Sequence, residues 1–369
     1  MPANEPRATQ LDPQRVPTTP RRWYVRLPRD LGTWGPVFAF VVVIVVFGTW
    51  KPSIFLSREN ILSILNDNAV LSVLACGLTV VLLTGEFDLS IGSAMTLAGV
   101  LSAGFVANAH LATPLAVLLT LLIGLIIGWV NGVLVFYLRV NALIATLAVG
   151  SILEGFTLFY TGGRVIYQGI PDSYIQIGRA SIGAVSAPIF YMVVAGFILW
   201  AMLKYTMPGR YLHAIGGNRD AARLSGIRVG RYVIMAFMIS GLCAAIAGIV
   251  QTGRNGSAEP TGGASFLLPA FAAAFLGAAT LRRGEFHIVG TLIGVYLIAS
   301  ATSGFFILGA PFYTEEFISG GLLIAATATS RFLSAGRPAK LPPLVSQAPA
   351  ATARPQGRPD QNSTSSMPP

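Results

Sequence analysis

The sequence predicts an all-α membrane protein, a polytopic bundle of about ten transmembrane helices, and two observations support this prediction. Hydrophobic residues make up 53% of the 369 residues and charged residues only 11%, whereas a soluble domain carries about 25% charged residues. The few charges gather in clusters, and long apolar runs separate these clusters. A transmembrane helix needs about 20 mostly apolar residues, so the runs are expected to cross a membrane.

The expected spans define one membrane domain with a tail on either side. The apolar centres of the spans lie at 37–47, 69–83, 91–107, 114–138, 142–160, 189–203, 233–250, 267–281, 288–308 and 317–329. We therefore expect a basic tail over residues 1–33, a transmembrane domain over 34–333 and a Pro- and Ser-rich tail over 334–369. The composition of both tails is typical of disorder.

The formal net charge of +10 fits an unequal distribution of charge across the membrane better than nucleic-acid binding. If the N-terminus is cytoplasmic, the loops on that side and the two tails hold twenty of the twenty-five Lys and Arg residues. The remaining five are Lys51, Arg58, Arg164, Arg179 and Arg254. Because cytoplasmic loops are usually the basic ones, both termini are expected in the cytoplasm. The basic stretch 21–29 is expected to lie against anionic membrane lipid.

Sequence patterns of known catalytic or metal-binding sites are missing. The three histidines are far apart, and neither a His-Glu-x-x-His nor a Gly-x-Ser-x-Gly pattern occurs. Without a Walker A loop, the chain is not expected to bind or hydrolyse ATP by itself. Cys76 and Cys243 lie in apolar runs, so they are expected to be buried thiols rather than a disulfide or a metal site.

Ionisable residues within spans often mark functional sites in membrane proteins. Glu154 lies in the fifth run, and Glu86 and Asp88 lie between the second and third. An ion-coupled secondary transporter or facilitator would use such carboxylates, so it is an alternative. A membrane-embedded enzyme or scaffold is a third hypothesis. Glu154 could also simply bond a neighbouring helix or reach towards the outer surface.

The loop between the sixth and seventh runs carries a helix signal of its own. Gly216 and Gly217 interrupt the preceding structure, and Asn218 is a good N-cap. Residues 219–225 favour a helix of about two turns, roughly 10 Å long, and Gly226 can adopt the left-handed conformation that ends helices. This helix could dock a partner protein or lie on the lipid headgroups, and the loop sequence favours both equally.

From about Asn60 to about Ser330 the sequence resembles the permeases of ribose-type ATP-binding-cassette importers. Residues 85–93 look like the Gly-x-x-Asp-Leu-Ser-x-Gly-Ser signature of that family. The other matching segments, in order, are 60–62, 141–147, 160–163, 209–227, 258–263 and 290–294. Each motif is modest by itself, but their order and spacing together are specific.

The resemblance implies a permease subunit that imports a sugar or sugar-like solute across a bacterial inner membrane. In this family two permeases, often identical copies, surround a central pathway. Two cytoplasmic ATPase domains on another polypeptide bind ATP and Mg²⁺, and a sugar-loaded extracytoplasmic binding protein docks outside. No cofactor, no metal and no enzyme activity are therefore expected on this chain.

The resemblance also assigns candidate site residues. The ATPase contact falls on Gly217, Asn218, Arg219, Asp220, Ala221, Ala222, Arg223, Leu224, Ser225 and Gly226. The signature places Asp88, Leu89, Ser90 and Gly92 at a structurally demanding turn between spans rather than on the sugar. Further candidates for the pathway are Asn141, Thr146 and Glu154. The family often has Arg where Glu154 stands, so this position departs from the pattern.

Overall fold

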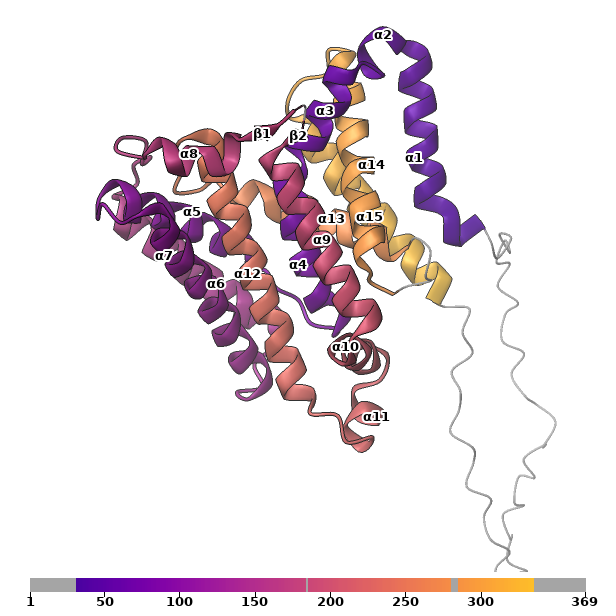
Figure 1. The fold of residues 1–369 in the computed structure, drawn as a ribbon. Coiled ribbons are helices and arrows are strands. Elements are labelled where there is room, and N and C mark those ends of the chain that lie inside the picture. Colours follow the sequence, from indigo (N-terminus) through magenta and orange to yellow (C-terminus); the bar gives the residue numbers. More distant parts are fainter. Residues whose placement is uncertain (1–30, 184, 280–284, 335–369) are drawn as a thin grey trace, which may run out of the picture.

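The computed structural model describes residues 31–183, 185–279 and 285–334, and these ranges form a bundle of helices with one short hairpin (Figure 1). The long helices are α1 (Leu31–Trp50), α4 (Ala69–Leu83), α5 (Ile91–Ala107), α6 (Thr113–Phe136), α7 (Ala142–Thr161), α9 (Ala187–Tyr205), α12 (Val229–Asn255), α13 (Ala264–Ala278), α14 (Ile288–Ile307) and α15 (Thr314–Ser334). The shorter elements are α2 (Pro52–Phe55), α3 (Arg58–Asp67), α8 (Asp172–Arg179), β1 (Ser181–Ile182), β2 (Val185–Ser186), α10 (Met207–Gly217) and α11 (Arg219–Leu224). Strands β1 and β2 are antiparallel.

Each of the ten predicted apolar runs corresponds to one long helix. Five helices are individually long and apolar enough to cross a membrane. A sixth span results if α3 and α4, which meet at an angle of 42°, are taken together. The protein is therefore a polytopic helical membrane protein. The predicted tails lie outside the described residues, except that residues 31–33 belong to α1 and Ser334 to α15.

The core of the bundle is built around α12, which contacts α4, α5, α6 and α8. Most of its middle section is buried, including the large side chain of Phe237. Helix α6 approaches α12 most closely, through a stripe of glycines, Gly124, Gly128 and Gly132, at four-residue intervals. A Cβ atom on Gly128 would overlap the backbone carbonyl of Phe237, and one on Gly124 would overlap that of Gly241. Glycine in this stripe permits backbone contact, the usual way in which membrane helices pack closely.

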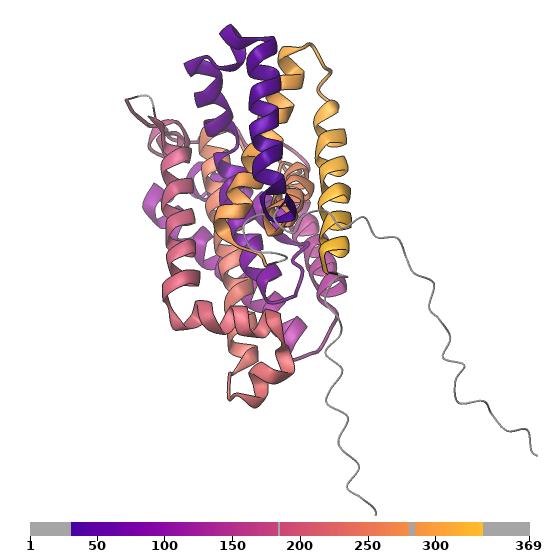
Figure 2. The same ribbon diagram turned by 90° about the vertical axis from the view of Figure 1, so that its right-hand side faces the viewer.

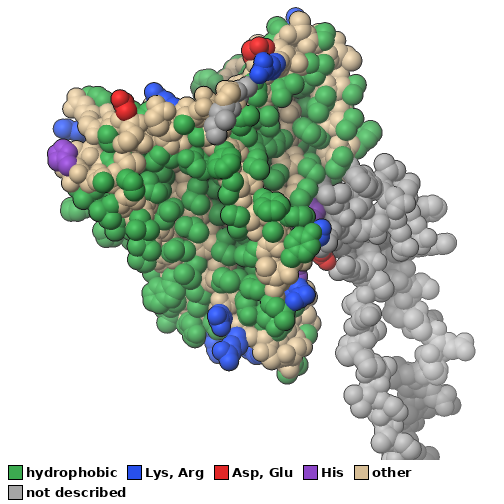
Figure 3. All heavy atoms as spheres, viewed as in Figure 1, with side chains coloured by type: hydrophobic (Ala, Val, Ile, Leu, Met, Phe, Trp, Pro, Cys, Tyr) green, Lys and Arg blue, Asp and Glu red, His purple; other side chains and the backbone are tan. Residues whose placement is uncertain are grey.

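The two ends of the bundle carry different short elements. In Figure 1, α2, α3, α8 and the hairpin lie at the upper end, and α10 and α11 lie at the lower end. The view turned by 90° shows α10 lying across the ends of the long helices (Figure 2). Hydrophobic side chains cover the side of the molecule between the two ends, and the charged side chains lie mainly at the ends (Figure 3). This distribution matches a bundle with an apolar belt for the lipid.

Candidate functional site

Helix α11 has the ends and the cap that the loop sequence predicts. Helix α10 stops at Gly217, and the Asn218 side-chain oxygen accepts a hydrogen bond from the backbone N–H of Ala221 at 2.9 Å. Gly226 closes the turn with a φ of 81°. Ala222 is buried and anchors the short helix to the bundle, whereas Leu224 on its other side is 90% exposed. The helix therefore presents an apolar side chain at the lower end of the molecule.

Helix α10, which holds α11 below the bundle, is an element that the sequence analysis missed. Its signal lies in Thr206 and Pro208. The Thr206 side chain accepts a hydrogen bond from the N–H of Gly209, and the proline stands in the first turn, where its missing N–H does no harm. Gly209 lies against the backbone of Leu203, so α10 folds back tightly on the end of α9.

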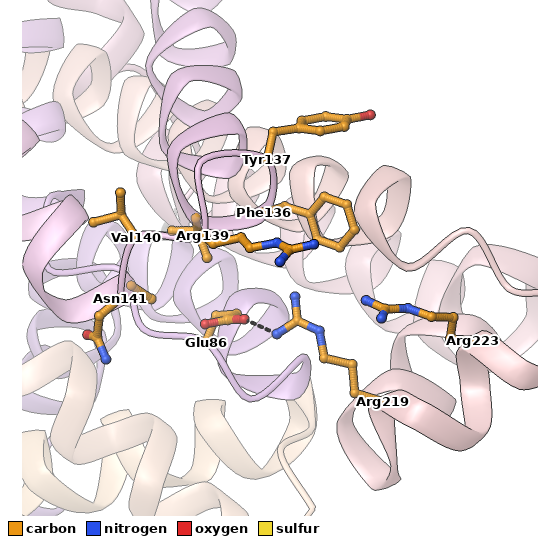
Figure 4. A pocket seen from close by; sticks show the side chains of 10 residues that line it. Glu86, Phe136, Tyr137, Arg139, Val140, Asn141, Arg219 and Arg223 are labelled. Carbon is orange, nitrogen blue, oxygen red and sulfur yellow. Dashed lines mark hydrogen bonds and ion pairs between the residues drawn. The ribbon is translucent and has the colours of Figure 1, made fainter.

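An ion pair joins α11 to the turn between α4 and α5. The guanidinium of Arg219 lies 2.5 Å from the carboxylate of Glu86, and it also lies over the ring of Phe136, 5.7 Å from its centroid (Figure 4). The Glu86 side chain is only 14% exposed, which screens the pair less than a fully exposed pair. Residues 133 positions apart in the sequence are thus in direct contact.

The turn itself, residues 84–90 (the α4–α5 turn), is held by a buried carboxylate. Asp88 is 2% exposed, and its oxygens accept hydrogen bonds from the Ser90 N–H, the Ser90 hydroxyl at 2.6 Å and the Ser240 hydroxyl at 2.7 Å. The side-chain amide of Asn131 donates to the Ser90 hydroxyl at 2.7 Å. Residues from α6 and α12 therefore meet at this one turn.

The other signature residues also serve the packing of this region. The Leu89 N–H donates to the hydroxyl of Thr146 on α7 at 3.0 Å. A Cβ on Gly92 would lie 2.8 Å from the carbonyl oxygen of Gly263, so only glycine allows α5 to meet the start of α13. Thr146 is completely buried. These side chains are oriented towards neighbouring helices.

Asn141 and Glu154 differ from Thr146 because both are exposed. Asn141 caps α7, since its side-chain oxygen accepts from the N–H of Leu143 at 3.0 Å. Glu154 accepts a hydrogen bond from the Ser93 hydroxyl of α5 at 3.0 Å, which is the neighbouring-helix bond considered above. The exposed face of α7 around it includes Leu147 and Leu158, so one carboxylate lies on an otherwise apolar surface.

A hollow of about 510 Å³ lies between α11 and the α6–α7 connection, and Figure 4 shows the side chains around it. Its charged lining consists of Glu86, Arg139, Arg219 and Arg223, so positive charge dominates. Arg139 has a φ of 53°, a conformation that few non-glycine residues adopt. Among the described residues, no group of three or more His, Cys, Asp or Glu is placed to hold a metal ion. Cys76 and Cys243 are buried free thiols.

Comparison with known proteins identifies first the class and then the family. The bundle with its apolar helices is that of a polytopic membrane protein, and the proteins it is similar to are transport permeases. The chain belongs to the family described as the branched-chain amino acid transport system permease component, whose family model matches residues 60–327. No solved structure matches it.

Curated relatives cover most of the chain. The ribose import permease protein of Haemophilus influenzae is 35% identical over 80% of this chain and 92% of the relative. That of Bacillus subtilis is 37% identical over 82% and 93%. The D-allose transport system permease protein of Escherichia coli is 31% identical over 82% and 92%. The resemblance found in the sequence motifs is thereby confirmed.

The family membership decides between the hypotheses drawn from the sequence. The chain is a multi-pass protein of the bacterial inner membrane and a permease subunit of an ATP-binding-cassette importer. It is not an enzyme, because ATP is hydrolysed by a separate ATPase subunit, and an extracytoplasmic binding protein delivers the solute. Ion-coupled transport, the alternative, has no support among these relatives.

We expect Asp88→Ala to destabilise the folded chain. The change leaves the buried hydroxyls of Ser90 and Ser240 without their acceptor, and each unsatisfied buried group costs about 1–3 kcal/mol. A thermal melt of the purified protein in detergent would show a clearly lowered midpoint. Glu154→Gln is the matched control, because that carboxyl group is exposed and its hydroxyl partner can still donate to the amide oxygen. Equal melting of the two variants would show that the turn does not depend on Asp88.

Proposed function

We propose that this permease imports a sugar or a sugar-like solute. The relatives with the highest identities quoted above carry names that refer to ribose and D-allose, and others are named autoinducer 2 import permeases. The family description refers to branched-chain amino acids, so the two solute classes must be distinguished. The match to the ribose permeases extends over more than 90% of their length, and this supports a sugar as the solute.

The proposal includes ten spans with both termini in the cytoplasm. The five long spans and the bent α3–α4 pair would be joined by α1, α5, α13 and α15, which are shorter or less uniformly apolar. The end that carries α11 would face the cytoplasm. Basic residues at that end of the described chain include Arg139, Lys204, Arg210, Arg223, Arg228 and Arg231, and such an excess is typical of cytoplasmic loops.

Helix α11 is proposed as the contact with the ATPase, and its exposed Leu224 as the centre of that contact. Of the ten residues at 217–226, eight are exposed, Arg219 is partly buried in its ion pair and Ala222 faces the bundle. An apolar side chain that is 90% exposed is a good anchor for a partner groove, because its burial there removes a large apolar surface from water. ATP and Mg²⁺ would bind to the partner alone.

The Arg219–Glu86 pair gives the proposed contact a mechanical route into the membrane domain. A shift of α11 would displace Glu86, and Glu86 stands two residues before Asp88 in the α4–α5 turn. Because that turn bonds α6, α7 and α12, several helices would respond to one movement. The Arg219–Glu86 ion pair is the observation that best supports a pathway whose access is switched by the ATPase.

A second copy of the chain is proposed to pack against the exposed face of α7. Leu147, Phe156 and Phe159 on this helix are 60%, 60% and 86% exposed. Glu154 on the same helix would then lie near the pathway between the two copies. If the second copy is identical, the exposed α7 faces of the two copies would cover each other.

The solute class is tested by uptake. Cells that express the chain with its ATPase and binding protein should accumulate labelled ribose, and unlabelled ribose or allose should compete, whereas leucine should not. The reason is that sugar hydroxyls require polar partners which an apolar amino-acid side chain cannot satisfy. Competition by leucine alone would contradict the sugar proposal while leaving the family membership intact.

The ATPase contact is tested by Leu224→Ser. Removing the exposed apolar side chain should reduce co-purification of the ATPase and uptake by about tenfold or more, the scale of a binding anchor. Met207→Ser is the matched control, because Met207 is an exposed apolar residue of α10 at the same end of the molecule. If both variants retained the ATPase equally well, α11 would not be the docking element.

The route through the ion pair is tested by charge reversal. Glu86→Arg and Arg219→Glu should each abolish most ATP-driven uptake, because each places two like charges next to one another. The double variant should recover much of the uptake, since it restores an attractive pair. Membrane levels of all three variants serve as the control. A double variant no better than either single one would rule out this pair as the link.

A further inference from the structure

A groove of about 840 Å³ opens on the side of the bundle where α6 and α12 reach the α11 end. It adjoins the hollow between α11 and the α6–α7 connection, and Phe136, Tyr137 and Arg223 border both. We call it the α6–α12 groove. Its rim carries Arg223, Arg228 and Arg231, and its deeper wall carries Ile234, Met235 and Met238.

The rim is positive and has no acidic counterpart. All three arginines are exposed, none forms an ion pair with a described residue, and the lining of the groove contains no Asp or Glu. Figure 3 shows blue side chains gathered at the lower end of the molecule, directly below a continuous hydrophobic surface. The rim therefore attracts an anion at the boundary between water and the apolar belt.

The wall continues the rim into the apolar belt along a single face of α12. Ile234, Met235 and Met238 follow Arg231 by three, four and seven residues, a spacing that places side chains above one another on a helix. From Arg231 to Met238 the helix rises about 10 Å, which is a large part of the depth of one lipid leaflet. The three wall side chains are partly buried against the bundle and partly exposed, so each still offers apolar surface to a ligand outside it.

We propose that the α6–α12 groove binds an anionic phospholipid, with its phosphate at Arg228 and Arg231 and an acyl chain against Ile234 and Met238. Such a molecule has a negative headgroup followed by an apolar chain, just as the groove has a basic rim followed by an apolar wall. A soluble ATPase could place acidic groups at the rim, but it could not cover the wall, which lies at the depth of the membrane. Basic pockets beside cytoplasmic helix ends are a known type of lipid site. The lipid would fix the start of α12 relative to α6, immediately beside α11.

Native mass spectrometry of the purified full-length chain tests this proposal. Delipidated protein is mixed with phosphatidylglycerol or with phosphatidylcholine of identical acyl chains. We expect phosphatidylglycerol to remain bound preferentially, and the double variant Arg228→Gln with Arg231→Gln to lose about tenfold in its retention, since each basic residue near an anionic surface contributes measurably. Arg210→Gln is the matched control, because Arg210 is exposed at the same end but outside the groove.

A second variant tests the apolar wall separately. Met238→Trp fills the groove without changing its charge, so it should also reduce phosphatidylglycerol retention. Equal retention of both lipids, or equal losses in the double variant and in Arg210→Gln, would overturn the proposal. So would efficient cross-linking of Arg231→Cys to the ATPase or to a second copy in the membrane, because the groove would then hold protein. None of these measurements depends on which solute is transported.

Discussion

The buried carboxylate of Asp88 is the interaction on which the rest of the membrane domain depends. A polar group in an apolar interior is stable only when its hydrogen-bonding capacity is used, and here the donors come from Ser90 on the turn and Ser240 on α12. Asn131 extends the network to α6. The position of the α4–α5 turn is thereby fixed by directional bonds, whereas the surrounding helix contacts are mostly apolar and less specific.

The position of this turn explains how a surface helix can influence the interior. Glu86 lies at the edge of the turn and Asp88 lies at its centre, so the turn has one contact with α11 and several with the spans. A turn held by several directional hydrogen bonds transmits a displacement better than a loop without them would. The helix cap at Asn218 and the buried Ala222 serve the same purpose at the other end of the link.

Much of the fold could be predicted from the sequence, because apolar runs of sufficient length have few alternatives to spanning a membrane. The cap at Asn218 and the stop at Gly226 likewise defined α11 from local chemistry. The partners of Asp88 and Glu86 could not be predicted. Ser240 is 152 residues from Asp88, and Arg219 is 133 residues from Glu86.

These long-range partners could not be predicted for a physical reason. Neighbouring spans of similar composition contain no signal for their pairing, since lipid and helix surfaces are equally apolar. Helix α10 was missed for a different reason. It is a short amphipathic segment between two spans, and its only markers are the Thr206 cap and Pro208 in its first turn.

The glycine stripe between α6 and α12 has a consequence for the transport cycle. Where two backbones touch through Gly124 and Gly128, neither helix can slide or rotate without steric overlap. The pair must therefore move as one solid body when the pathway opens and closes. The hinges of alternating access are then expected outside it, in the surrounding helices, where larger side chains can exchange rotamers as the protein cycles.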